Sequence, residues 1–76
     1  MPHTIWKTQI DKRYDAHVER TAPLLGDLVL ALEGHELLRK PVTITGDARF
    51  GVDSQDEQEW VDCCCAIIDA RAASPA

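Results

Sequence analysis

The chain has 76 residues, of which 45% are hydrophobic and 28% charged, and its formal net charge is −5. A chain of this length has room for one hydrophobic core, so we expect residues 1–76 to form a single small domain. The acidic charge disfavours nucleic-acid binding, since such a domain repels phosphate backbones. The sequence contains no run of about 18 apolar residues and no secretory signal, so we expect a cytoplasmic protein without a membrane partner.

Apart from Lys12, residues 6–19 alternate between mainly apolar side chains at even positions and polar side chains at odd positions. This period of two predicts an antiparallel strand with one buried face. A single straight strand of this length would span about 46 Å, which is too long for so small a chain. We therefore predict a turn or bend in the polar stretch 11–13. The segment 28–32 is apolar at every position, which is typical of a central strand.

Turn signals follow the central strand. Gly34 predicts a type II′ hairpin turn, because glycine adopts positive φ without strain. The return strand, at about 37–44, contains Pro41, which lacks the N–H group that a central strand needs. This strand is therefore expected to lie at a sheet edge or to carry a bulge. Gly46 indicates a further turn, and the alternation over 50–52 allows a short last strand.

The last predicted element is a helix over residues 54–72, followed by a frayed tail at 73–76. Ser54 and Glu57 have the spacing of a capping box, and Arg71 complements the negative end of the helix dipole. At 100° per residue, apolar side chains form one stripe and acidic ones lie opposite. The stripe contains Trp60, Val61, Cys64, Ile67 and Ile68. The acids assigned to the N-terminus or the polar side are Asp53, Asp56, Glu57, Glu59, Asp62 and Asp69.

These elements predict an α+β fold. An antiparallel sheet of three to five strands in meander order, over about residues 5–52, packs against one C-terminal α-helix. Trp60 is expected to anchor the helix to the sheet, because it is the largest side chain of the apolar stripe.

The three consecutive cysteines do not predict a metal site. Adjacent side chains on a helix diverge by 100°, so Cys63, Cys64 and Cys65 cannot close one tetrahedral site. We expect Cys64 in the core and its two neighbours partly buried. The sequence also shows no phosphate-binding motif and no combination of nucleophile, base and oxyanion donor. We therefore predict no metal, no cofactor, no small-molecule ligand and no catalytic residue.

The expected function is that of a non-enzymatic protein-interaction module, which forms a homodimer and binds another protein. Trp6 is hard to cover within so small a core and marks a sheet edge that can pair across a two-fold axis. The acidic helix face is the other candidate surface, with Glu59, Asp62 and Asp69. The same acids are also explained as a solvated face whose charge stabilises the helix.

Two alternative functions stay open at this point. The first is a small acidic inhibitor, of phage or defence type, that occupies the basic nucleic-acid groove of a partner. The second is an accessory subunit of a larger enzyme. The inhibitor depends on the acidic helix face, whereas a homodimer depends on the sheet edge near Trp6.

Overall fold

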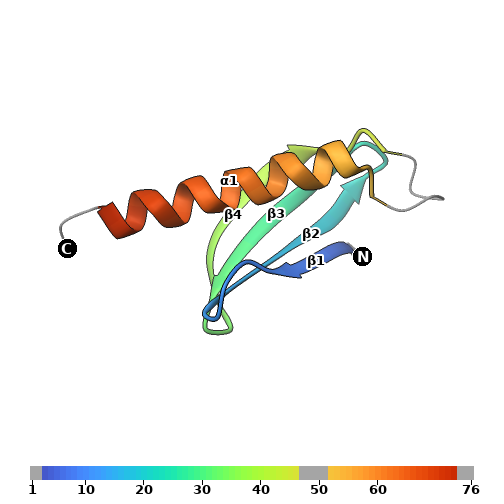
Figure 1. The fold of residues 1–76 in the computed structure, drawn as a ribbon. Helices are drawn as coiled ribbons and strands as arrows, with labels where there is room; N and C mark the ends of the chain where they lie inside the picture. The colour runs from blue at the N-terminus through green and yellow to red at the C-terminus, as the bar shows by residue number, and fades with distance from the viewer. Residues whose placement is uncertain (1–2, 47–51, 74–76) are drawn as a thin grey trace.

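The computed structural model describes residues 3–46 and 52–73. Its elements, in chain order, are β1 (His3–Gln9), β2 (Tyr14–Ala22), β3 (Leu25–Leu32), β4 (His35–Thr43) and α1 (Ser54–Ala73). The strands form one antiparallel sheet in the order β1-β2-β3-β4, and α1 lies across one face of it (Figure 1). The predicted α+β fold is confirmed, with a four-strand meander and one C-terminal helix.

The alternating segment 6–19 forms two strands joined by the predicted turn. β1 ends at Gln9 and β2 begins at Tyr14. Asp11 shapes the turn, since its Oδ1 accepts hydrogen bonds from the backbone N–H groups of Arg13 (2.7 Å) and Tyr14 (3.1 Å). A carboxylate that accepts bonds from the next residues is a common way to hold a tight reversal.

β3 is a central strand, as predicted, and the chain reverses after it through Glu33 and Gly34. Leu32 pairs with His35, and the two residues between them have φ values of 52° and 86°. Two positive φ values define a type I′ turn, so the predicted type II′ turn is wrong. The twist of a type I′ turn matches the right-handed twist of the flanking strands. Gly34 is the second of the two loop residues in this turn. Glu33, the first, adopts the left-handed region.

Replacing Glu33 with Asn should stabilise the protein, because Asn tolerates the left-handed region and Asn-Gly suits a type I′ turn. We expect the free energy of unfolding, measured by urea denaturation, to rise by about 0.5–1 kcal/mol. The opposite control is Gly34→Ala, whose added methyl group would meet no atom within 4 Å. It should lose about 1 kcal/mol through backbone strain alone. A lower midpoint for Glu33→Asn would contradict this account.

β4 has both features predicted for the strand that contains Pro41. It lies at an edge of the sheet, and its register with β3 shifts between Leu30 and Ala31, which leaves Leu37 unmatched. The further strand predicted at 50–52 lies outside the described residues, apart from Val52, which is not in a strand.

The core lies between α1 and one face of the sheet. It consists of Tyr14, Ala16, Val18, Leu28, Leu30, Ile44, Trp60 and Cys64. Trp60 is only 2% exposed, so its predicted role as the anchor of the helix is confirmed. Val61, Ile67 and Ile68, the other members of the predicted stripe, are only half-buried. Ile67 and Ile68 still pack against the core, so most of the stripe lies against the protein's own sheet.

The first turn of α1 differs from the predicted capping box. The side chain of Asp53 accepts a hydrogen bond from the N–H of Gln55 (2.8 Å), and its backbone carbonyl accepts one from Glu57 (3.0 Å). These bonds make Asp53 the N-cap, one residue before the predicted Ser54. Aspartate caps a helix as well as serine does, so two adjacent candidates compete and backbone geometry decides between them.

Asp56 is buried, whereas the sequence pattern placed it among the exposed acids. It is 2% exposed, and it accepts hydrogen bonds from the N–H (2.8 Å) and hydroxyl (2.6 Å) of Thr45 and the N–H of Gly46 (3.2 Å). Burial alone would raise the pKa of Asp56, but these bonds outweigh it and hold the pKa below its ordinary value. Asp56 therefore joins the start of α1 to the segment that follows β4.

Candidate functional site

The two edges of the sheet differ in how well they are protected. β4 carries Pro41, which has no N–H group, and an unmatched residue at Leu37. Prolines and bulges are the usual features that keep an edge strand from pairing with another chain. β1 has a register shift between Thr4 and Trp6 but contains no proline. β1 is therefore the less protected edge, and it carries the tryptophan predicted to bind a partner.

Trp6 lies on the sheet face that α1 covers. Its ring packs against that of Trp60, with centroids 5.4 Å apart and planes inclined at 59°. Trp60 is buried, but Trp6 is only half-buried at the margin of the core. This contact explains how a small core covers part of Trp6, while the rest remains accessible beside β1. Its role in binding a partner stays a prediction.

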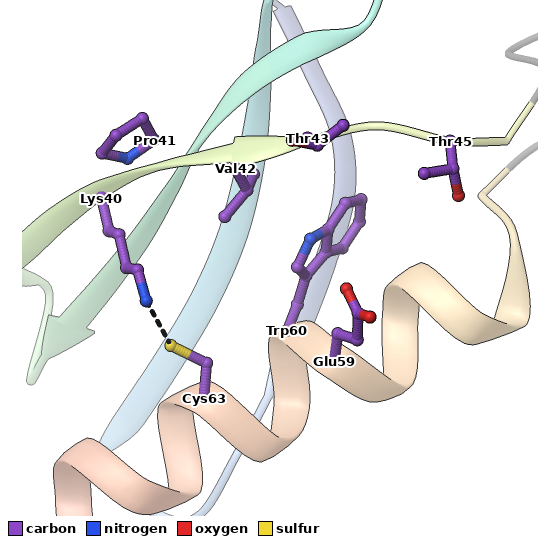
Figure 2. A pocket seen from close by; sticks show the side chains of 8 residues that line it. All are labelled: Lys40, Pro41, Val42, Thr43, Thr45, Glu59, Trp60 and Cys63. Atoms are coloured by element: carbon purple, nitrogen blue, oxygen red, sulfur yellow. Dashed lines mark hydrogen bonds between the residues drawn. The ribbon is translucent and has the colours of Figure 1, made fainter.

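The two sides of α1 differ in character. On the side next to β4, Glu59 and Cys63 line a groove between helix and strand (Figure 2). The opposite side of α1, about half a turn around the helix axis at 100° per residue, carries Val61, Cys65 and Ile68. We call these three side chains of α1 the β1 flank. Val61 and Ile68 are half-buried and Cys65 is exposed. A flank with incomplete cover, apolar apart from the exposed Glu57 one turn before Val61, therefore lies on the side of α1 away from β4.

The C-terminal half of α1 extends beyond the strands (Figure 1). Between this part of the helix and the β1–β2 turn is a hollow of about 340 Å³, whose lining includes Asp11, Tyr14, Ile68 and Arg71. Of the β1 flank, Ile68 therefore lies beside the β1–β2 turn and the end of β3 at Leu32. The hollow also shows why Ile68 is only half-buried, since the sheet does not follow the helix to its end.

The predicted acidic surface is divided in the structure. Glu59, Asp62 and Asp69 are all exposed. Glu59 lines the groove beside β4, 60–80° around the axis from the other two. Asp62 and Asp69 share the outer side of α1, about 10 Å apart along its axis, and Asp62 accepts a hydrogen bond from Gln58 (2.8 Å). The structure therefore brings two of the three acids together.

The groove between β4 and α1 has a volume of about 340 Å³. Figure 2 shows Lys40 reaching from β4 toward Cys63, and the ammonium donates a hydrogen bond to Sγ at 3.6 Å. A cysteine nucleophile needs a neighbouring base that a third group orients. Lys40 donates to this thiol instead of accepting its proton, so the contact does not assemble a catalytic pair.

The sheet face opposite α1 carries a salt-bridge network that the sequence pattern did not reveal. Arg39 binds Glu19 (2.9 Å), Asp27 (3.2 Å) and Glu36 (2.9 Å), and Glu19 also contacts His17 (3.1 Å). The bond from Arg39, with that from His17, holds the pKa of Glu19 below its ordinary value, and the carboxylates raise the pKa of Arg39. The network is solvent-exposed, so we assign it a small contribution to stability.

The cysteines are free thiols with three different environments. Cys64 is buried, and burial, assisted by its two neighbours, raises its pKa to about 11. The predictions for Cys64 and for the half-buried Cys63 are confirmed. The prediction for Cys65 is wrong, because its side of α1 has no strand beneath it and leaves it exposed.

Across residues 3–46 and 52–73, no three potential metal ligands gather. The same residues include no helix that is long and apolar enough to cross a membrane. Comparisons with family models, with curated proteins and with solved structures give no match to this chain. Its function is therefore argued from its surfaces.

Proposed function

We propose that this protein is a non-enzymatic interaction module that works as a homodimer. The observation that carries the proposal is the incompletely covered β1 flank of α1, on the same side of the molecule as the less protected sheet edge. A second copy would cover both features at once, because a two-fold interface uses the same patch from each subunit. The free thiols favour a reducing compartment, and we place the protein in the cytoplasm.

The small size of the chain is consistent with a partner. A domain of about 60–80 residues buries only about 60% of the surface that its unfolded chain exposes. Domains of this size are only marginally stable, so self-association would add stability by mass action.

The homodimer is tested by the mass of the protein in solution. Light scattering should give twice the 8.5 kDa of the monomer. Val61→Lys places a charge on the β1 flank but outside the core cluster, so it should weaken dimerisation at least about tenfold without changing the circular dichroism spectrum. Ala66→Lys adds the same charge at an exposed position outside the β1 flank and should leave the dimer intact. A wild-type monomer at every concentration would refute the proposal.

A second candidate function, an acidic inhibitor of a protein with a basic nucleic-acid groove, is favoured by the exposed pair Asp62 and Asp69. The double substitution Asp62→Lys and Asp69→Lys should then abolish a salt-sensitive complex while the circular dichroism spectrum stays unchanged. If the double variant still captures the same partner, the acidic side of α1 is not its binding site.

A further inference from the structure

We infer that the two copies pair through their β1 strands, antiparallel across a two-fold axis, so that two four-stranded sheets join into one. This inference rests on the proposed homodimer and specifies its geometry. In this dimer, the surface near Trp6 that the monomer leaves uncovered contacts the same surface of a second copy.

The backbone of β1 is suited to this pairing. Along any edge strand, alternate N–H and C=O groups point away from the neighbouring strand. All seven residues of β1, His3–Gln9, carry an N–H group, but the register shift between Thr4 and Trp6 interrupts the alternation, so the regular series of outward donors runs from Trp6 to Gln9. On β4, Pro41 pairs with Asp27, and a proline within an edge strand removes a donor that a pairing strand would use. The two edges therefore differ in chemistry as well as in position.

Charge also favours β1 as the contact between copies. Each copy carries a net charge of −5, so two copies repel wherever their acids meet. β1 contains no acidic residue, and its basic side chains are His3 and Lys7. Pairing through the outer side of α1 would instead bring together Asp62 and Asp69 of both copies. The β1 edge lets two acidic chains associate with Asp62 and Asp69 pointing away from the contact.

The symmetry places the two helices on the same face of the joined sheet. Identical strands that pair antiparallel in one sheet are related by an axis perpendicular to that sheet, which leaves each face on its own side. Both copies of Trp6 then lie on the helix-covered face, on either side of the axis. Val61 follows Trp60 and turns toward the axis, whereas Ile68 lies at the end of the sheet beside the β1–β2 turn. The β1 edges and both copies of Trp6 therefore lie in one interface.

Amide hydrogen exchange, measured by NMR, tests this pairing. In the dimer, the amides of β1 that do not bond to β2 should exchange roughly tenfold or more slowly than in the monomer, because the interface must open first. The Val61→Lys variant supplies the monomer. Should that variant fail to fold, wild-type protein diluted below its dimerisation constant supplies it. The outer amides of β4 serve as the control and should exchange equally fast in both states.

The outcomes separate the strand pairing from the homodimer. Slow exchange at alternate β1 amides, found only in the dimer, supports the pairing. A stable dimer whose outward β1 amides exchange as fast as those of the monomer overturns the pairing and leaves the homodimer in place. A wild-type chain that stays monomeric overturns both, and leaves the β1 edge for a strand of another protein.

Discussion

The Asp56→Ala variant is expected to unfold at a much lower urea concentration than the wild type. The substitution removes the buried acceptor that joins α1 to the end of β4 and leaves the N–H groups of Thr45 and Gly46 without their partner. Bonds to a buried charged group make this loss about 3 kcal/mol. For 76 residues the whole free energy of unfolding is only about 4–11 kcal/mol. Urea titration followed by circular dichroism measures the change.

The same carboxylate should make the wild type sensitive to acid. The pKa of Asp56 in the folded protein lies below its ordinary value of 3.8. A depressed folded pKa means that the ionised group stabilises fully above the pKa of the unfolded chain, and that this contribution is lost as the pH falls through the folded value. Asp56→Asn does not titrate at this site. The difference in stability between wild type and Asp56→Asn should therefore shrink as the pH is lowered below 3.8.

The exposed Asp62 is the matched control for Asp56. It lies on the same helix, and its side chain accepts a hydrogen bond from Gln58. Asp62→Asn should change the free energy of unfolding by less than about 0.5 kcal/mol. If the substitutions at both positions changed the free energy of unfolding equally, the buried hydrogen bonds of Asp56 would contribute no more than the exposed one of Asp62.

Local sequence chemistry was sufficient to predict the architecture. The alternation over 6–19 and the apolar segment 28–32 gave the strands, since a period of two is what a half-buried sheet requires. Pro41 predicted an edge strand or a bulge because it lacks an N–H group, and the same missing group protects the edge in the structure. The details that failed depend on small energy differences between neighbours. Asp53 and Ser54 are comparable caps, and both turn types accept a glycine in the loop.

The burial of Asp56 illustrates a limit of assigning one role to a residue. Its acidity and position near the start of the helix suggested interaction with the dipole, which needs no partner. On the helix, however, Asp56 lies four residues before Trp60 and eight before Cys64, so all three share one stripe. These are the three buried residues of α1. The spacing could have identified Asp56, but its partners Thr45 and Gly46 follow β4 and are placed by tertiary structure.

The candidate site was predictable only where it depends on a single strand. Trp6 and its edge could be inferred from the pattern, whereas the network around Arg39 could not. Its three carboxylates come from β2, β3 and β4. Their proximity depends on the cross-strand register, which shifts at Leu37. A slip of one residue moves a side chain to the other face of the sheet, so alternation alone does not show which charges meet.

The Trp60→Ala variant is expected to lose most of the stability of the fold. Trp60 is 2% exposed and packs against Trp6 and the core beneath α1. Replacing a buried tryptophan with alanine typically loses about 3–5 kcal/mol, because the helix and sheet cannot close the cavity. That loss approaches the total stability of a domain of this size. Thermal unfolding should show a much lower midpoint for Trp60→Ala. Trp60→Phe keeps an aromatic ring at this position and should retain most of the wild-type stability.

Trp6→Ala separates the two roles of the tryptophan pair. Trp6 is half-buried in the monomer, so its loss should destabilise the fold by about 1–2 kcal/mol, less than the loss of Trp60. Its larger effect should be on association, because the dimer would bury the part that the monomer leaves exposed. A folded Trp6→Ala variant that remains dimeric would assign Trp6 to the core alone. A folded monomer would show that one ring stabilises the helix–sheet contact within a chain and the contact between two chains.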